Sequence, residues 1–134
     1  ADLPEDGKAN FGEPVVNTYP INEEVTLLRA DQGQVQLAVN QYGMGRGVYL
    51  SGLPYSAVNA RLLERILFYA SGQEDRYRDW SCTNPHCEVA YFPQEGVYCV
   101  VNNTDLPQET RVRQADGQVR DIVLEPSAMV WQQA

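Results

Sequence analysis

The sequence predicts an α+β fold: a β-hairpin and a helix from the end of an α/β domain, followed by a small antiparallel domain resembling a β-sandwich. Two apolar runs flank a glycine-spaced turn within residues 34–50, helical periodicity follows, and five short strand-like runs fill residues 87–132. We divide the chain into a linker or flexible amino end (1–18), the C-terminal part of the α/β domain (19–75) and an antiparallel β-domain (76–134).

The hairpin is predicted from two strand patterns. Apolar and polar residues alternate over 34–39, and 48–50 is a short run of strand formers. Glycines tolerate the positive φ of a tight turn. A phosphate cradle is a weak alternative because a strand, not a helix, follows, and Ser51 lacks the flanking glycines of a nucleophile elbow. The turn glycines are Gly43, Gly45 and Gly47.

A helix is predicted over residues 57–71. Ser56 is a good N-cap, and Gly72 suits the C′ position just past the helix. Charged residues lie off the apolar stripe, so we expect one buried face and one solvated face. The stripe consists of Val58, Leu62, Leu63, Ile66, Leu67 and Ala70, and the charged residues are Arg61, Glu64 and Arg65.

The β-domain is predicted from short runs divided by Pro, Gly and Asp. Asp116-Gly117 is the strongest turn signal, because both residues tolerate the positive φ of a two-residue hairpin turn. About sixty residues are few for an independent core, so we expect packing against the preceding helix or hairpin. Expected contributors to the core or junction are Trp80, Phe92, Tyr98 and Trp131. The predicted strands are Cys87–Phe92, Gly96–Asn102, Thr110–Gln114, Val119–Leu124 and Ala128–Gln132.

Composition limits the partners. The 134 residues are 43% hydrophobic, enough for a packed core, and 10 basic against 18 acidic residues give a net charge of −8. That charge repels phosphate, so we expect no nucleic acid and no anionic membrane as partner. No apolar run approaches the roughly 20 residues that span a bilayer, and the amino end lacks signal-peptide features, so we expect a cytoplasmic protein.

The cysteines invite a metal hypothesis. Cys82, His86 and Cys87 carry zinc-ligand chemistry, with Cys99 as a fourth candidate. The paired short spacings of structural zinc sites are missing, and Cys99 inside an apolar run is typical of a core residue. An odd cysteine count suits a reducing compartment. A Cys/His nucleophilic pair is formally open, but a histidine beside Pro85 is more typical of a loop. We expect no metal and no cofactor.

Two other motifs have plain alternatives. Asn102-Asn103-Thr104 matches a glycosylation sequon, a pattern short enough to occur by chance. Glu23-Glu24 and Glu74-Asp75 are acidic pairs in polar segments, more typical of solvated faces or caps than of a carboxylic acid with a raised pKa. We therefore expect no catalytic residue, no cofactor-binding residue and no metal ligand in this chain.

Three stretches, residues 19–75, 98–110 and 124–131, resemble the carboxy-terminal part of lacto-N-biose phosphorylases, also called 1,3-β-galactosyl-N-acetylhexosamine phosphorylases. The similarity extends from Phe11 onward, and its most specific stretch is SGLPYS at 51–56 followed by NARLL at 59–63. A more distant likeness is to the rear domains of certain β-galactosidases.

The resemblance implies a large enzyme with an amino-terminal (β/α)₈ barrel, a central α/β domain and a C-terminal β-domain. Such enzymes split galactosyl-β-1,3-N-acetylhexosamine with inorganic phosphate and invert the anomeric centre, giving α-galactose 1-phosphate. One carboxylic acid protonates the leaving oxygen, and phosphate replaces the water of an inverting hydrolase. That acid and the phosphate-binding residues belong to the barrel, so none is carried over to this chain.

Two classes of function remain open. The first is a non-catalytic segment of such a phosphorylase, with an architectural role or a subunit contact, whose partner is the barrel and the rest of the central domain. The second is a carbohydrate-binding module, which the eight tyrosines and two tryptophans permit. An exposed row of Tyr91, Tyr98 or Trp131 on one sheet face would favour the second, and burial of these side chains the first.

Overall fold

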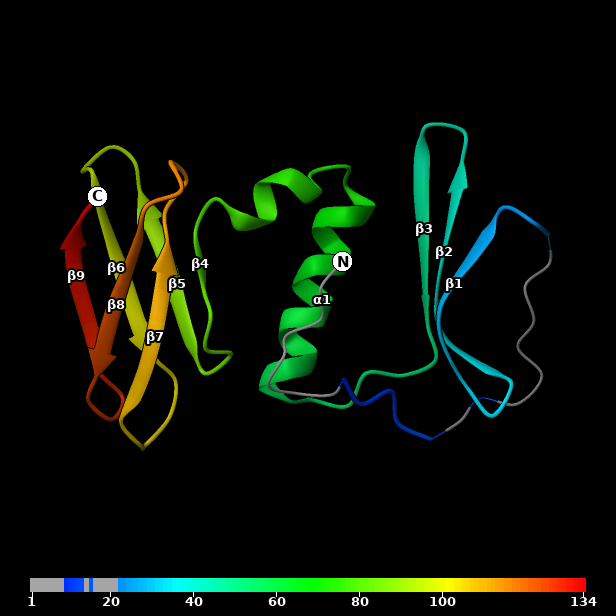
Figure 1. Cartoon of the computed structure of the whole chain (residues 1–134), viewed down its shortest axis with the longest axis horizontal. Coiled ribbons are helices and arrows are strands. Elements are labelled where there is room, and N and C mark those ends of the chain that lie inside the picture. The colour runs from blue at the N-terminus through cyan, green and yellow to red at the C-terminus, as the bar shows by residue number, and fades with distance from the viewer. Residues whose placement is uncertain (1–8, 14, 16–21) are drawn as a thin grey trace. The chain divides into compact units, whose positions relative to one another are not determined.

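The computed structural model describes residues 9–13, 15 and 22–134. The chain divides after Glu74 into two compact units. The secondary structure of the described residues is mostly antiparallel β-sheet with one α-helix (Figure 1). Within the described residues, no helix has the length and apolar character needed to cross a membrane.

The first unit contains a three-stranded antiparallel sheet in the order β1 (Val25–Asp31), β2 (Gln34–Tyr42), β3 (Gly45–Leu50). Strand β1 was absent from the sequence-based prediction. Its pairing with β2 shifts register between Leu27 and Ala30, so apolar and polar residues do not alternate along it. A bulged strand of this kind escapes a search for two-residue periodicity.

The hairpin between β2 and β3 has a two-residue turn, because Tyr42 pairs with Gly45. Gly43 has a φ of 58°, as the first position of a type II′ turn requires. Gly45 and Gly47 lie inside β3, outside the positive-φ region. The prediction of a turn built from all three glycines is therefore wrong, although the hairpin itself is present.

Helix α1 (Ala57–Ala70) begins and ends where the capping residues indicate. The Ser56 Oγ accepts a hydrogen bond from the Asn59 amide at 3.1 Å, which confirms the N-cap. Gly72 has a φ of 70° and donates to Tyr69 O at 3.0 Å, while Gln73 N donates to Phe68 O at 2.8 Å. These two bonds form a Schellman motif and confirm Gly72 as C′.

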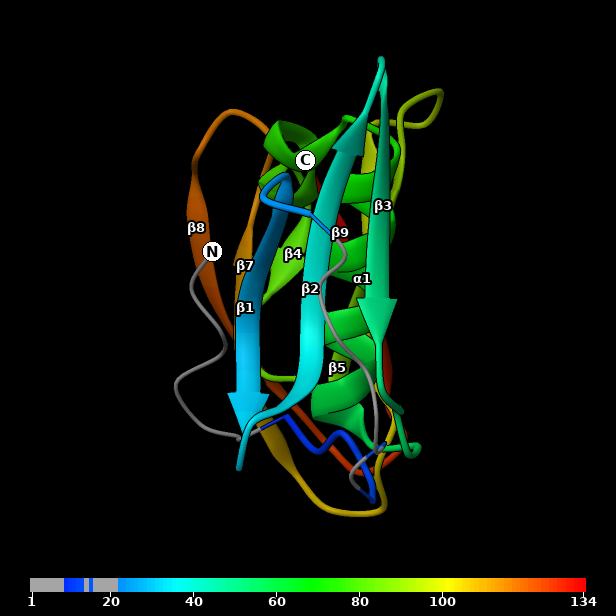
Figure 2. The ribbon, with the colours of Figure 1, turned by 90° about the vertical axis from the view of Figure 1, so that its right-hand side faces the viewer.

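The core of the first unit lies between the sheet and α1, which packs on β3 (Figure 2). Phe11, Leu37 and Leu62 are buried together there. Phe11 comes from the segment before the sheet, so that segment completes the core. Partly buried residues around it are Ala9, Val48, Leu50, Leu53 and Ile66.

The second unit contains two three-stranded antiparallel sheets, ordered β4-β7-β8 and β5-β6-β9. A short 3₁₀ helix, η1 (Glu74–Arg78), precedes them. All five predicted strands are present, two of them with the predicted bounds and three with ends shifted by one or two residues, and β4 is additional. The strands are β4 (Ser81–Cys82), β5 (Cys87–Phe92), β6 (Val97–Asn102), β7 (Gln108–Arg113), β8 (Val119–Leu124) and β9 (Met129–Gln133).

The two sheets share one core. Tyr98 and Val100 from β6 are fully buried with Val112 from β7 and Leu124 from β8. Tyr98 is therefore a core residue as predicted, and Trp80 packs against this core. Phe92 and Trp131 are both exposed and lie outside this core, so they do not contribute to it. Their place at the junction with the preceding helix or hairpin stays a prediction.

The β7–β8 hairpin departs from the predicted two-residue Asp-Gly turn. Gln114 N donates to Gln118 O at 2.8 Å, so three residues form the loop, and Gly117 N donates to Gln114 O at 3.0 Å. Gly117 has a φ of 87°, whereas Asp116 is not in the positive-φ region. The Asp116 carboxylate accepts from Gln118 N at 2.9 Å instead, which stabilises the longer loop.

Candidate interaction faces

The stretch SGLPYS has structural roles in this molecule. A Cβ at Gly52 would lie 2.6 Å from the Phe11 carbonyl oxygen, so only glycine lets the two backbones approach this closely. Ser56 caps α1, and the Pro54 carbonyl accepts a hydrogen bond from Asn59 at 2.6 Å. The most distinctive stretch of the sequence thus positions residues 9–13 and the helix.

Asn59 is buried at 1% exposure, and sequence reasoning gave it no role. Its Nδ2 donates to the carbonyl oxygens of Asn10 (2.7 Å) and Pro54, and its Oδ1 accepts from Asn10 N at 3.1 Å. A buried amide with these partners fixes the chain on both sides of it. The available signal was an asparagine in the first turn of the helix, where Ser56 already supplies the N-cap, so that Asn59 was free for another structural role.

Arg46 joins β3 to the C-terminal end of α1. Its Nη1 donates to Tyr69 O at 3.1 Å and to Glu74 Oε1 at 2.6 Å, and its guanidinium lies 4.8 Å from the centre of the Tyr69 ring. The hydrogen bond from Arg46 holds the pKa of Glu74 below its usual value, and the same bond raises the pKa of Arg46. Glu74 is therefore an ionised partner rather than a proton donor.

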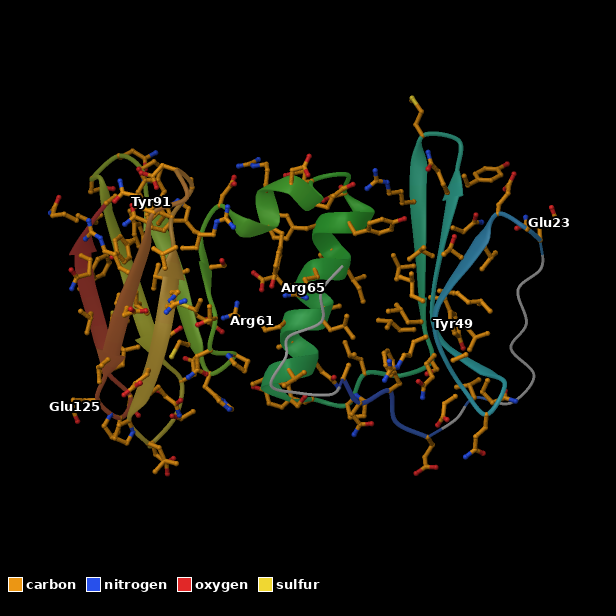
Figure 3. The ribbon with its side chains drawn as sticks, viewed as in Figure 1. Glu23, Tyr49, Arg61, Arg65, Tyr91 and Glu125 are labelled. Atoms are coloured by element: carbon orange, nitrogen blue, oxygen red, sulfur yellow. The ribbon has the colours of Figure 1, made fainter. Side chains whose placement is uncertain are left out.

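The other acidic candidates lie at the surface. Glu23, Glu24 and Asp75 are exposed, and Figure 3 shows Glu23 pointing away from the strands beside it. A general acid for glycoside chemistry needs a carboxyl group whose pKa is raised by an apolar or crowded site. Glu23, Glu24 and Asp75 do not lie in an apolar or crowded site of this kind.

The thiols and the histidine are not gathered into one site. Cys82 and Cys87 belong to the core between the sheets, while Cys99 is buried elsewhere and His86 is exposed. None of the three cysteines forms a disulfide, and all three are buried. Within residues 9–13, 15 and 22–134, no group of three or more His, Cys, Asp or Glu side chains is placed to hold a metal ion.

The sequon asparagine is a structural residue. Asn102 is buried and its Nδ2 donates to Leu106 O at 2.7 Å and to Glu125 O at 2.9 Å. Its Oδ1 accepts from both the backbone and the hydroxyl group of Thr104. A glycan on this amide would remove these bonds and would need solvent access that the fold denies, so Asn102 is not an acceptor in the folded state.

Helix α1 has a second apolar stripe that faces solvent. We define the outer helix stripe as Ala60, Leu63, Leu67 and Ala70, which recur at helical spacing and are all exposed, with Leu67 at 62%. The prediction that Leu63, Leu67 and Ala70 are buried is therefore wrong within this chain. Arg61 instead pairs with Glu64 at 3.1 Å and its side chain is only 15% exposed, so it is not on a solvated face either.

The sheet β5-β6-β9 is apolar on both faces. Tyr98 and Val100 face the core, so their neighbours Val97, Cys99 and Val101 face outward. Strand pairing places two large side chains beside them, Met129 at 59% exposure and Trp131 at 55%. We define the outer apolar face as Ala90, Phe92, Val97, Cys99, Val101, Met129 and Trp131.

Cys99 lies at the centre of the outer apolar face. Strand pairing sets Ala90 on one side of it and Trp131 on the other, and the rings of Phe92 and Trp131 are 5.3 Å apart. Cys99 is 4% exposed, and this burial raises the pKa of its thiol. A buried thiol with a raised pKa is expected to react slowly.

The outer face of the other sheet is charged. Arg111 on β7 faces Asp121 on β8, and Nε donates to the carboxylate at 2.9 Å. Glu109 and Arg113 lie on the same side. An open hollow in this surface is lined by Thr83, Glu109, Arg111, Asp121 and Val123, among others. This face suits water, in contrast to the outer apolar face.

The three aromatic residues weighed for sugar binding do not form an exposed row. Tyr98 is fully buried, and Tyr91 stacks on Trp80 with ring centres 4.4 Å apart. Tyr91 pairs across the strands with Tyr98, on the core side of the sheet, whereas Trp131 points outward. Trp131 instead contacts Phe92, which is also exposed and was not among the residues weighed for sugar binding from the sequence.

Comparison with known families gives two matches that divide the chain. The lacto-N-biose phosphorylase central domain matches residues 3–75, and the lacto-N-biose phosphorylase C-terminal domain matches residues 80–132. The chain belongs to the lacto-N-biose phosphorylase family. The resemblance seen in the sequence is therefore confirmed, including its restriction to the C-terminal portion of longer proteins.

Relatives in this family are much longer than the chain. A 1,3-beta-galactosyl-N-acetylhexosamine phosphorylase of Bifidobacterium longum subsp. longum is 66% identical over 96% of this chain, but the match covers 17% of that protein. One from Lachnoclostridium phytofermentans is 43% identical over 91% of the chain and 17% of its own length. A D-galactosyl-beta-1->4-L-rhamnose phosphorylase of that organism is 30% identical over 72% of the chain and 13% of its own length. The chain thus spans about a sixth of the length of the first two relatives and less of the third.

Proposed function

We propose that this chain is a non-catalytic, architectural segment of an inverting phosphorylase. The parent enzyme would convert galactosyl-β-1,3-N-acetylhexosamine and phosphate to α-galactose 1-phosphate and N-acetylhexosamine. Residues 19–75 would end its central α/β domain, and residues 76–134 would form its C-terminal β-sandwich-like domain. Their partner is the remainder of the enzyme, which would work in the cytoplasm. The family membership of this chain, at about a sixth of its relatives' length, carries the proposal.

The first unit supports an unfinished α/β layer. In the described part of this unit the sheet has three strands with β1 and β3 at its edges, and the outer helix stripe is apolar and exposed. In α/β domains the apolar stripe of a helix is normally buried against the sheet or a neighbouring element. An exposed apolar stripe therefore marks a surface that another part of the protein covers. If another part of the enzyme covers the outer helix stripe, Leu63 and Leu67 would be exposed only in this chain.

Inert chemistry is the second support. Inverting transfer needs a carboxylic acid that stays protonated until it meets the leaving oxygen. Glu74, whose pKa is lowered by Arg46, has the opposite tendency. The Arg46 guanidinium is occupied by Tyr69 and Glu74, so it is not poised for phosphate. The segment therefore supplies shape rather than reacting groups.

The test is a phosphorolysis assay on the isolated chain, with release of galactose 1-phosphate as the readout. We expect no turnover from galactosyl-β-1,3-N-acetylglucosamine or the N-acetylgalactosamine analogue with phosphate. The matched experiment removes these residues from the parent enzyme, where we expect loss of soluble, folded enzyme. Turnover by the isolated chain would refute the proposal.

A carbohydrate-binding module is the second candidate, favoured by the exposed Phe92–Trp131 pair. Aromatic rings exposed on a sheet can stack on sugar faces. The discriminating measurement is tryptophan fluorescence during titration with galactosyl-N-acetylhexosamine disaccharides. Saturable quenching that Trp131→Ala abolishes would favour the module over the architectural role.

A further inference from the structure

We propose that the outer apolar face is a docking surface for an apolar patch elsewhere in the same enzyme chain. The inference rests on the proposed function, because the occupant belongs to the remainder of the phosphorylase. It goes further by assigning one face of the C-terminal unit to that contact. The other sheet face, with its Arg111–Asp121 pair, stays in water.

The composition of the face indicates burial. Its large exposed members are Met129 and Trp131 from β9, at 59% and 55% exposure, and Phe92 from β5, whose ring reaches that of Trp131 across β6. Glu88 and Gln133 lie at its corners, on the same side of the sheet. Along a strand with one solvated face, residues normally alternate between buried and exposed, with polar residues on the exposed side, as they do along β7. Strand β6 reads Val-Tyr-Cys-Val-Val-Asn instead, apolar on both sides.

The area and charge argue against a second copy of this chain as the occupant. Three strands about five residues long present on the order of 300 Å² to a partner. A stable association between separate proteins needs roughly 800 Å² from each. A net charge of −8 on each copy further opposes self-association. A patch tethered in the same chain needs no such area, because the tether supplies a high effective concentration.

Chemistry also argues against a sugar. Sugar sites combine a flat aromatic surface with several hydrogen-bonding side chains. The rings of Phe92 and Trp131 are tilted by 43°, so they do not form one plane. Aliphatic side chains surround them, with Met129 and Val101 on the next pair of positions. A dry, apolar partner fits this surface better than a hydroxyl-rich one.

The chain contains two methionines, Met44 and Met129, and both side chains are exposed in it, so oxidation by peroxide reports on cover. The rate of sulfoxide formation at Met129 is measured by peptide mass spectrometry in the isolated chain and in the full enzyme, with the unfolded enzyme as reference. We expect both methionines to oxidise rapidly in the isolated chain. In the enzyme we expect Met129 to oxidise roughly tenfold or more slowly.

A pair of variants tests whether the outer apolar face must be covered for the C-terminal unit to dock in the enzyme. Met129→Lys places a charge on the outer apolar face, while Val123→Lys places the same charge on the exposed outer face of the other sheet. Neither should change the melting temperature of the isolated chain by much, since both sites face solvent. In the enzyme, Met129→Lys alone should accelerate limited proteolysis around residues 75–80, because the charge opposes docking.

Each outcome decides the proposal. Equal oxidation of Met129 in chain and enzyme, or equal effects of the two lysine variants, would overturn it. Protection of Met129 in the isolated chain that grows with protein concentration would assign the face to a second copy. Protection by a galactosyl-N-acetylhexosamine disaccharide would assign it to sugar. The proposed function fails separately, through turnover by the isolated chain.

Discussion

Asn59 and Asn10 bond reciprocally: the Asn59 amide nitrogen donates to the Asn10 carbonyl at 2.7 Å, and the Asn10 amide donates back to Asn59 Oδ1 at 3.1 Å. The pair joins two places 49 residues apart. It holds the segment that carries Phe11 against the start of α1, where Phe11 fills the core.

Replacing Asn59 should destabilise the first unit. Asn59→Ala removes the side chain that satisfies two carbonyls and one amide, and unsatisfied buried groups cost about 1–3 kcal/mol. The midpoint of urea unfolding, followed by circular dichroism, measures the loss. Asn103→Ala, at an exposed asparagine, serves as the control and should leave the midpoint unchanged. Equal midpoints for the two variants would remove Asn59 from this role.

Gly52→Ala should also destabilise the chain. The new Cβ would lie 2.6 Å from the Phe11 carbonyl, so one backbone must move, at a cost of about 1–3 kcal/mol. Gly47→Ala is the matched control, because its Cβ would meet no atom closer than 3.9 Å and its φ is not positive. Thermal unfolding of both variants checks this. A Gly52→Ala chain as stable as Gly47→Ala would mean that the approach is looser than the structure indicates.

The Cys99 thiol should react slowly with Ellman's reagent, because burial raises its pKa and leaves little thiolate at neutral pH. Trp131→Ala should open one side of it and increase the labelling rate of Cys99 roughly tenfold. Trp131→Phe keeps a ring over the thiol and should change the rate far less. Peptide mapping separates labelling of Cys99 from labelling of Cys82 and Cys87. If Trp131→Ala left the labelling rate of Cys99 unchanged, Trp131 would not shield the thiol.

The Arg46–Glu74 pair predicts a pH dependence of stability. The pKa of Glu74 is lower in the folded chain than in the unfolded chain, so its contribution is present above the unfolded pKa and is lost as the pH falls through the folded pKa. Glu74→Gln should therefore lower stability at neutral pH and have little effect in acid. The difference should be small and weaken with salt, since the pair is partly exposed.

Urea unfolding between neutral pH and pH 3 measures this dependence. Glu23→Gln, at an exposed residue of the same unit, is the comparison and should show no such convergence. A stability difference for Glu74→Gln that persists unchanged in acid would show that the ion pair is not its source.

Local signals were read correctly from the sequence. Ser56 and Gly72 act through bonds to their near neighbours, and the five runs of the C-terminal half are bounded by turn residues, so short-range chemistry was enough. The β7–β8 loop was misjudged by one residue because the Asp116 side chain competed with the backbone for the Gln118 amide.

Long-range features were not readable. Strand β1 is bulged, and Asn59 finds its partners across 49 residues. Phe92 and Trp131 were expected in the core or the junction because large aromatic residues in small β-domains are usually buried, yet they lie on the side of a sheet that faces away from the core of their unit. The continuous apolar run of residues 97–101 was the available signal of such a sheet.

An unalternating strand has a consequence for folding. When both sides of β6 are apolar, sliding it by one residue against β5 or β9 would exchange Val97, Cys99 and Val101 for Tyr98 and Val100 with little change in hydrophobicity. Asn102 breaks this degeneracy at the end of the strand, since its amide finds the Leu106 and Glu125 carbonyls in one alignment only. A single buried polar side chain therefore selects one register for three strands whose apolar residues alone would allow two.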